Sequence, residues 1–558
     1  MTSAAGFREI HTSGRCFFKG KYFCDCPTID RLLFQKSEFF CRMVLLWKTF
    51  GLIVLRFSRL SIAYGRGHYI MKKTKDGLVK NILFNNIYQI FNLIIPLILA
   101  PYISRVLTPT GVGIKSYTNT YVTYFMMIAS LGTIEYGTRE IARVRDDPVK
   151  LSSTFWEIEI LTVFSTMASI IGWCFLAQFY KEYSFYLWIW TIQIVGALFN
   201  ISWFFVGIER LKYTLSINLV IKIISFVLTI LFVKNADDTW IYILILSLTS
   251  FFGFLSTWIF LPKFLVRSRP NLHAVFTRHL KQTFIYFLPS VATSVYTVLD
   301  KTLIGIISKN DDYNGFYEQA TKIVDLGKVL GFSAINGVVT SRASYLYKLE
   351  NKDKIQQLMD NAMNVNLFLS IAISFGICAI SSVFVPLFFG EGYEMTTQML
   401  YVLAPLVFVI SLSNTCGSVY FTPSNHRMQS TLFLVIGSVI NLSMNIVLIS
   451  SIGPIGACIS TLFAETVISV LYVSFCKIIT WKKILELAWR KLIAGSMMFS
   501  VVYLFIRYVD MNHIVLLLIG IFGGALIYVL MLMLLRDPVF RQIREYLKEK
   551  RKMDNKEN

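Results

Sequence analysis

Charged side chains occur inside several long apolar stretches of this sequence. Lys222 and Glu465 lie near the middle of two stretches, Asp300 and Lys301 are neighbours in a third, and Arg342 lies in a fourth. An isolated charge at the centre of a bilayer costs at least about 2.5–3.5 kcal/mol, so each needs an opposite charge or water. The three cations could attract a diphosphate group, while Asp300 or Glu465 could couple proton or cation movement by titrating. The alternative is that these charges form ion pairs between helices or extend to the membrane surface.

Uncharged polar residues follow helical spacing in three of these stretches. Asn336 belongs to one such face, and Asn441 and Asn445 to another. A lipid-facing row of amides would be unpaired in hydrocarbon, so each face must meet either a hydrated cavity or a neighbouring helix. Three such faces favour a cavity that hydrogen-bonds a polar substrate. The first face, at i, i+4, i+8, i+11 and i+15, comprises Asn81, Asn85, Gln89, Asn92 and Pro96.

The composition indicates what kind of element must position these residues. Hydrophobic residues make up 55% of the 558 residues and charged residues only 16%, which is more apolar area than a soluble core could hide. The formal net charge of +21 is typical of basic cytoplasmic loops beside anionic lipid, so no nucleic-acid partner is expected. The sequence therefore predicts an all-α polytopic membrane protein.

Fourteen stretches after Met71 are long enough to span a bilayer, which takes roughly 20 mostly apolar residues. With the N-terminus placed in the cytoplasm, the inner loops hold 21 Lys and Arg residues and the outer loops eight. This bias predicts that both ends are cytoplasmic. The stretches are 82–104, 115–135, 157–179, 184–206, 214–233, 240–261, 283–307, 324–345, 364–389, 397–421, 429–450, 455–476, 488–508 and 513–535.

Short segments recur in matching places of the two halves. Residues 113–120 correspond to 315–322, and residues 209–215 to 426–432, at offsets of 202 and 217. The offset covers six spans, an even number, so the sequence predicts a parallel repeat about an axis along the membrane normal. We expect a six-helix lobe at 71–281, a second at 282–480, two extra transmembrane helices at 481–535 and a charged cytoplasmic tail at 536–558.

Residues 1–70 differ from the rest of the chain. They form a basic extension whose semi-apolar run, 39–62, is interrupted by four Lys or Arg residues. It lies either on the membrane surface as an amphipathic segment or outside the translated protein, if translation begins at Met71; we favour the second reading. The nine Cys show no disulfide or zinc spacing, and no nucleotide or hydrolase motif occurs. We therefore expect no metal, no cofactor and no enzymatic activity.

Five segments resemble the Wzx-type polysaccharide flippases, also called the polysaccharide transport family. The resemblance extends from Met71 to about residue 535 and has no counterpart for residues 1–70. It places the chain beside multidrug and toxin extrusion transporters and lipid II flippases, in the multidrug/oligosaccharidyl-lipid/polysaccharide exporter superfamily. The segments are Asn81–Tyr88, Ile103–Gly113, Leu131–Glu140, Asp300–Gly305 and Gly453–Glu465.

This resemblance implies two six-helix lobes, a cationic central cavity and alternating access. The implied cargo is an undecaprenyl-diphosphate-linked oligosaccharide repeat unit for O-antigen, capsule or another surface polysaccharide, moved outward across the bacterial cytoplasmic (inner) membrane. Implied partners are a polysaccharide polymerase and a chain-length regulator, with a proton or sodium ion as counter-ion. A cation-coupled drug antiporter is the alternative. The family offers no substrate-binding motif that can be assigned to numbered positions here, so the candidate residues are chosen by their depth in the membrane and the helix face they occupy. The candidates for ion coupling are Asp300 and Glu465. The candidates for the substrate cavity are Asn85, Gln89, Asn92, Lys222, Lys301, Asn336, Arg342, Asn441 and Asn445.

Overall fold

The computed structural model describes residues 75–210, 212–540 and 542. The side chains of residues 75–93, 212, 288–290 and 292–297 are outside this description. The expectations for residues 1–70 and for most of the tail therefore fall outside the described residues. So do the side chains of Asn85, Gln89 and Asn92, although their backbone belongs to helix α2.

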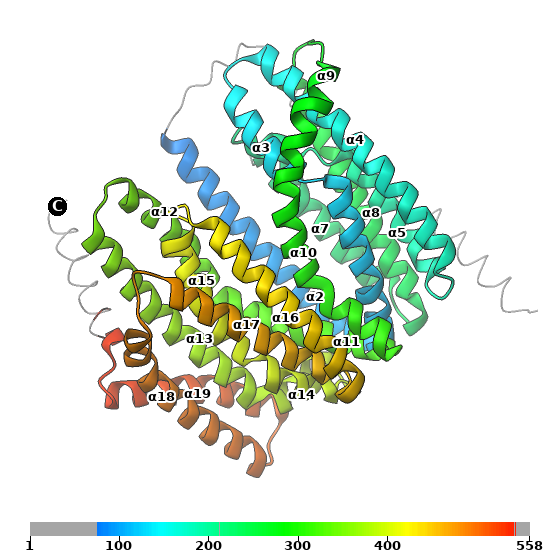
Figure 1. The fold of residues 1–558 in the computed structure, drawn as a ribbon. Helices are drawn as coiled ribbons and strands as arrows, with labels where there is room; N and C mark the ends of the chain where they lie inside the picture. The colour runs from blue at the N-terminus through cyan, green and yellow to red at the C-terminus, as the bar shows by residue number, and fades with distance from the viewer. Residues whose placement is uncertain (1–74, 211, 541, 543–558) are drawn as a thin grey trace, which may run out of the picture. The chain divides into compact units, whose positions relative to one another are not determined.

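Every regular element of the described chain is helical (Figure 1). Prolines and polar caps mark many of the helix starts. At α4, the Asp147 carboxylate accepts hydrogen bonds from the backbone N–H groups of Lys150 and Val149, both at 3.1 Å, and these bonds hold the pKa of Asp147 below its usual value. The helices before residue 280 are α2 (Lys75–Ser130), α3 (Thr133–Val144), α4 (Pro148–Phe179), α5 (Ser184–Gly196), η1 (Ala197–Phe199), α6 (Ser202–Gly207), α7 (Lys212–Phe232), η2 (Ala236–Asp238), α8 (Thr239–Thr257), η3 (Trp258–Lys263), α9 (Leu272–Ala274) and η4 (Val275–His279).

The second half of the chain is built in the same way. Its elements are α10 (Leu280–Ser308), α11 (Asp311–Lys328), η5 (Val329–Ser333), α12 (Ala334–Lys348), α13 (Lys352–Phe389), α14 (Glu394–Leu403), α15 (Pro405–Cys416), η6 (Gly417–Phe421), α16 (Arg427–Ile452), α17 (Pro454–Phe475), α18 (Trp481–Tyr508) and α19 (His513–Leu534).

All fourteen expected stretches lie in helical segments. Twelve helices of the described chain are long and apolar enough to cross a membrane. The two counts differ for two reasons. The first two expected stretches belong to one continuous segment interrupted at Thr108, and α10, which matches the seventh stretch, is not among the twelve.

The interruption of α2 separates two helices that run in different directions. Thr108 has φ 60° and ψ 175°, a conformation that a β-branched residue rarely adopts, and it precedes Pro109, which disfavours helix at the residue before it. The second part of α2, after Thr108, contacts α11 through the Thr110–Asp312 and Ser116–Glu318 hydrogen bonds. Residues 113–120 and 315–322, the first pair of repeated segments, are therefore neighbours in space.

The contact between these two segments is reciprocal. A Cβ atom on Gly113 would lie 1.8 Å from the carbonyl oxygen of Asp311, and one on Gly315 would lie 2.1 Å from that of Pro109. Pro109 and Asp311 are themselves 202 residues apart, as Gly113 and Gly315 are. The two glycines therefore make equivalent contacts in the two repeated segments. Two surfaces related by a two-fold axis meet in this way, and only glycine permits so close an approach of backbones.

The apolar packing is also divided along the chain. Two of the four buried apolar clusters contain only residues between 117 and 261, and a third lies wholly after residue 342. The fourth joins Ala100 to residues between 304 and 458. The first part of α2 therefore packs with the second half of the chain, while the apolar side chains of its second part pack with α4 and α5, in addition to its contact with α11.

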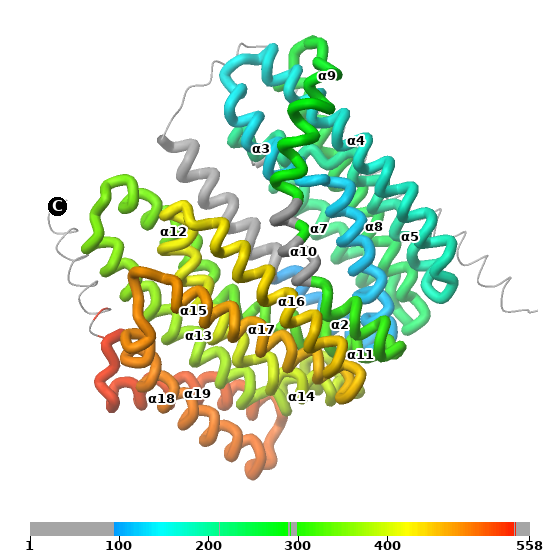
Figure 2. Tube along the Cα trace, in the orientation of Figure 1, coloured from blue at the N-terminus to red at the C-terminus, as the bar shows by residue number. Residues whose placement is uncertain are grey.

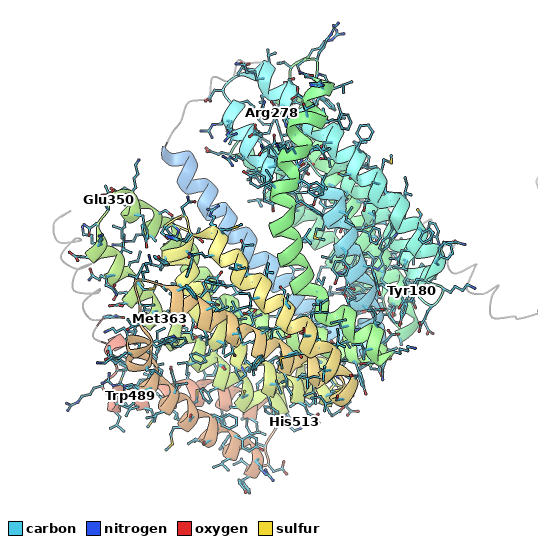
Figure 3. The ribbon with its side chains drawn as sticks, in the orientation of Figure 1. Tyr180, Arg278, Glu350, Met363, Trp489 and His513 are labelled. Carbon is cyan, nitrogen blue, oxygen red and sulfur yellow. The ribbon has the colours of Figure 1, made fainter. Side chains whose placement is uncertain are left out.

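The outward faces of the helices are apolar. On α4, Phe164, Ile171 and Phe175 are 56%, 72% and 65% exposed, and they share one helix face. Such faces suit lipid rather than water. In Figure 3, Arg278 lies at the end of the molecule where α4 begins and Tyr180 at the end where it finishes, so α4 runs the full distance between them.

Candidate functional site

A buried carboxylate, Asp300, is held by three helices. It lies in the second part of α10, and its Oδ2 atom accepts hydrogen bonds from the Tyr317 hydroxyl at 2.5 Å and the Thr461 hydroxyl at 2.7 Å. Its Oδ1 atom accepts one from the Asn445 amide at 2.7 Å. The same amide also donates to Asn441 Oδ1 at 3.0 Å. Side chains from α11, α16 and α17 therefore converge on this one acid.

The cluster around Asp300 retains an unused acceptor. The buried Oδ1 atom of Asn445 has no hydrogen-bond partner, and an unsatisfied buried acceptor is costly. A carboxylate with amide and hydroxyl oxygens is the donor set that hard cations prefer. The described residues contain no group of three or more His, Cys, Asp or Glu side chains that could hold a metal ion.

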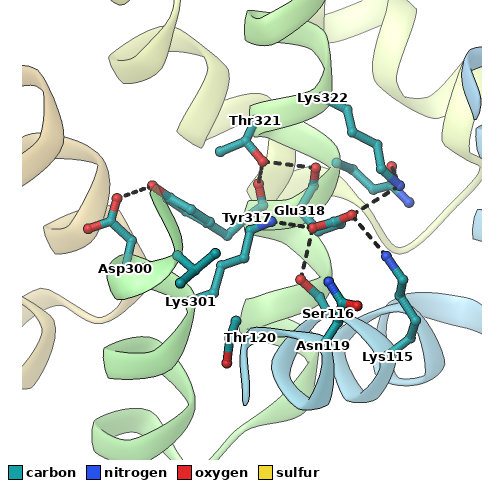
Figure 4. Close-up of polar contacts among 12 residues, drawn as sticks. Lys115, Ser116, Asn119, Thr120, Asp300, Lys301, Tyr317, Glu318, Thr321 and Lys322 are labelled. Atoms are coloured by element: carbon teal, nitrogen blue, oxygen red, sulfur yellow. Dashed lines mark hydrogen bonds and ion pairs between the residues drawn. The ribbon is translucent and has the colours of Figure 1, made fainter. Parts of the chain in front are cut away.

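Next to this cluster, Glu318 directly follows Tyr317 on α11 and is surrounded by lysines (Figure 4). Its Oε2 atom lies 2.5 Å from Lys301 Nζ, and its Oε1 atom lies 3.4 Å from Lys322 Nζ and 3.5 Å from Lys115 Nζ. Ser116 Oγ donates a hydrogen bond to Oε2 at 2.9 Å. Ser116 and Glu318 are 202 residues apart, so the cluster lies on the reciprocal contact between α2 and α11.

The charges of this cluster do not balance. Three ammonium groups against one carboxylate leave two positive charges. The Glu318 side chain is 8% exposed, whereas those of Lys115, Lys301 and Lys322 are 17%, 22% and 34% exposed. The acid is thus covered and the cations are more accessible. An excess of partly buried cations favours binding of a multivalent anion.

The candidates predicted from the sequence have different surroundings. Asp300, Asn441 and Asn445 form one cluster, and Lys301, next in the chain to Asp300, points instead to Glu318. Arg342 is exposed on α12. Lys222 on α7 and Glu465 on α17 are half-buried, and their roles remain predictions.

Asn336 has contacts that hold helices together. Its amide donates to Asn414 Oδ1 at 2.7 Å, and its own Oδ1 accepts from the Asn366 amide at 2.8 Å. Asn366 in turn donates to Thr415 Oγ1 at 2.7 Å. This network joins α12, α13 and α15, so at Asn336 the observed contacts match the packing interpretation of the polar face.

Three residues of the lysine cluster were missed in the sequence. Lys115 and Lys322 were counted as charges of outer loops, but they lie on α2 and α11. Glu318 was not singled out at all. Its signal was the repeated segment 315–322 itself, in which Glu318 and Lys322 are one helical turn apart.

The other end of α10 is bound to the first half of the chain. His279, directly before α10, is buried, with Nε2 2.9 Å from Glu157 Oε2 and Nδ1 2.8 Å from the Tyr136 hydroxyl. Arg278 pairs with Glu140 at 2.8 Å. Figure 2 shows the start of α10 beside α9 and its end beside α11, so one end of this helix is fixed to α3 and α4 and the other to α11, α16 and α17.

A cavity of about 250 Å³ lies apart from both clusters. Its polar lining includes Glu135, Thr162 and Asn200, with Thr123, Ser130 and Thr133. The described residues that line it include no lysine or arginine, so this cavity lacks the charge that would recognise an anion.

Glu159 on α4 provides a stability test. It is 3% exposed, and neither carboxylate oxygen has a hydrogen-bond partner. Glu159→Leu should therefore raise the free energy of unfolding by about 1–3 kcal/mol, because it removes an unsatisfied buried polar group. Glu157, two residues earlier, is bonded by His279, Ser153 and the Asn271 backbone, so Glu157→Leu should lower it by about 1–3 kcal/mol. Unfolding melts of both variants in one detergent check this, and a loss of stability in Glu159→Leu would contradict it.

Comparison with known proteins agrees with this architecture. The family model described as "Polysaccharide biosynthesis protein" matches residues 78–340. A relative from Escherichia coli K12 named "Putative O-antigen transporter" is 25% identical over 73% of this chain and 98% of its own. A Haloferax volcanii relative named "Probable low-salt glycan biosynthesis flippase Agl15" is 24% identical over 48% of this chain and 57% of its own.

Solved structures show the same fold at low sequence identity. The lipid II flippase MurJ in an inward closed conformation has a TM-score of 0.62 at 16% identity, covering 82% of this chain and 99% of its own. An inward-facing multidrug resistance transporter of the MATE family has a TM-score of 0.51 at 14% identity, covering 80% and 98%. This multi-pass membrane chain is therefore similar to proteins of polysaccharide biosynthesis, among them a putative O-antigen transporter and a probable glycan biosynthesis flippase.

Proposed function

We propose that this protein carries an undecaprenyl-diphosphate-linked oligosaccharide from the cytoplasmic to the outer leaflet of a bacterial inner membrane. The observation that carries the proposal is the uncompensated cluster of Lys115, Lys301 and Lys322 at the contact between α2 and α11. The family and its relatives support the movement of a lipid-linked glycan. The three lysines are the reason for proposing that the charged group of the cargo is a diphosphate.

The lysine cluster is suited to the charged part of such a cargo. A diphosphate group carries several negative charges, and lysine ammonium groups bind phosphate as mobile point charges. Two net positive charges in a partly covered site strengthen this attraction relative to water. A drug or organic cation would be repelled by the same cluster, which favours the flippase over the antiporter alternative.

The position of the lysine cluster also supports alternating access between two lobes. This cluster lies where 71–281 meets 282–480, and the reciprocal glycine contact closes one side of that boundary. With both termini in the cytoplasm, as the loop charges predict, the closed side faces outward. Opening it would require α2 and α11 to separate, which is the rocking motion expected of a parallel repeat. A polymerase and a chain-length regulator would then receive the cargo in the outer leaflet.

Asp300 is our candidate for counter-ion coupling, with Glu465 as the second. In proteoliposomes, the wild-type chain should move a fluorescent undecaprenyl-diphosphate-linked glycan between leaflets, at a rate that rises with a sodium or proton gradient. Asp300→Asn keeps the shape of the side chain but removes its charge, so it should abolish the gradient effect and slow transport about tenfold under a gradient. Glu465→Gln in the same assay compares the two candidates.

The outcomes separate the competing functions. Efflux of a cationic dye without movement of the glycan would overturn the flippase proposal in favour of drug antiport. Glycan movement that remains gradient-dependent in Asp300→Asn would leave the flippase proposal intact and remove Asp300 as the coupling residue.

A further inference from the structure

Glu318 breaks the symmetry of the contact on which it lies. Its counterpart at the offset of 202 is Ser116, and the two side chains are hydrogen-bonded to each other at 2.9 Å. The corresponding pair Thr110 and Asp312 is likewise joined, at 2.5 Å. In both pairs the second half thus supplies an acid where the first half supplies a hydroxyl, and of these two acids Glu318 is the one that the lysines contact.

The surroundings of Glu318 have the composition of an anion-binding site. Its two oxygens are contacted by three ammonium groups and one hydroxyl, contributed by α2, α10 and α11. Carboxylate and phosphate accept hydrogen bonds and charge from the same donors. One lysine would be enough to neutralise the Glu318 carboxylate, but three contact it. The lysine side chains are also more exposed than the Glu318 side chain.

The same contacts connect the two halves of the chain. Lys115 and Ser116 come from the second part of α2, whereas Glu318, Lys301 and Lys322 follow residue 282. The crossing glycines, Gly113 and Gly315, lie within one turn of Ser116 and Glu318 on α2 and α11. An anion that took the lysines from Glu318 would therefore remove the polar bridge beside this crossing.

We propose that Glu318 is a resident anion that occupies the phosphate position of the cargo site, and that the diphosphate of the cargo displaces it. Displacement transfers the lysines to the diphosphate and releases α2 from α11, so cargo binding favours separation of the two segments. This inference rests on the diphosphate-linked cargo proposed above. It adds that, before cargo binds, the protein's own carboxylate holds the site closed.

The first test measures binding of inorganic pyrophosphate to the full chain in nanodiscs by calorimetry. Glu318→Gln removes the competing charge while keeping the size of the side chain, so it should bind pyrophosphate at least about tenfold more tightly than wild type. The matched control is Asp325→Asn on the same helix, whose exposed carboxylate pairs with Lys328 at 3.0 Å. It should change the affinity less than about twofold.

The second test uses the unmodified protein and so does not depend on a variant that folds. A carbodiimide, which joins a carboxylate to an amine in direct contact, should link Glu318 to Lys115, Lys301 or Lys322, and mass spectrometry identifies the linked peptides. Pyrophosphate should lower the yield of these links in a saturable way. The Asp325–Lys328 link should not change.

The results distinguish this inference from the proposed function. If wild type binds pyrophosphate but the links persist and Glu318→Gln binds no more tightly, the resident-anion role is overturned while diphosphate recognition stands. If neither protein binds pyrophosphate, both the role of Glu318 and diphosphate recognition at this cluster fail. Tighter binding by Glu318→Gln without glycan movement in proteoliposomes would support the anion site and overturn only the flippase proposal.

Discussion

Replacing Lys491 by Met, with Asp537 retained, should lower the free energy of unfolding by about 3–5 kcal/mol. Both side chains are fully buried, with Nζ 3.0 Å from Oδ2 and 3.1 Å from Oδ1. The ammonium group also donates to Asn364 Oδ1 and to the Leu487 carbonyl, both at 2.7 Å. Removing the cation alone leaves a buried carboxylate without its charge partner, which is the costly way to break such a pair.

Two control variants make this prediction specific: one that removes both charges of the buried pair, and one that breaks an exposed ion pair on the same helix. Lys491→Met with Asp537→Leu removes both charges, so it should recover most of the lost stability. Lys483→Met, on the same helix, breaks a 3.8 Å pair with Glu486 in which both side chains are about half exposed, and it should change stability by less than about 0.5 kcal/mol. Melts of the four proteins in one detergent provide the comparison. A Lys491→Met variant as stable as wild type would show that the pair does not anchor α18 and the segment after α19.

Lys491 also shows what the sequence could and could not supply. Hydrophobic stretches of about 20 residues predicted the helical segments, because length and apolarity are local properties. Lys491 was counted among the charges of an inner loop because it lies near the start of the stretch 488–508, and nothing close to it in the sequence reveals that Asp537, 46 residues later, pairs with it. Burial of a charge depends on a partner from another helix, and a single sequence contains no direct record of that pairing.

For the candidate site, too, the sequence predicted some of the residues and not others. Asp300, Asn441 and Asn445 were recognised because each interrupts an apolar helix, and the structure brings these three together through hydrogen bonds. Glu318 was missed although its segment was identified as a repeat. The repeat indicated which segments correspond, but not that the corresponding segments touch. That contact depends on the small size of Gly113 and Gly315, which permits the two backbones to meet.

The second large effect is expected at this contact. Gly113→Ala places a Cβ atom where the Asp311 carbonyl oxygen now lies at 1.8 Å, and Gly315→Ala does the same to the Pro109 carbonyl at 2.1 Å. The obstacles are backbone atoms, which cannot rotate away as a side chain can, so the second part of α2 must move away from α11. Each variant should destabilise the closed arrangement by about 3 kcal/mol or more, equivalent to a shift of roughly 100-fold in a conformational equilibrium.

The measurements are glycan transport in proteoliposomes and the carbodiimide links between Lys115 and Glu318. Both variants should lose the links and most of the transport, because the closed side of the boundary cannot form.

Gly337→Ala on α12 is the matched control, since nothing lies within 4 Å of its added Cβ. Alanine there should leave transport unchanged while raising helix stability by about 0.5–1 kcal/mol. Normal transport and normal links in Gly113→Ala would mean that the crossing of α2 and α11 is not a contact on which the transport cycle depends. Equal losses in all three variants would point to a general intolerance of alanine and not to this contact.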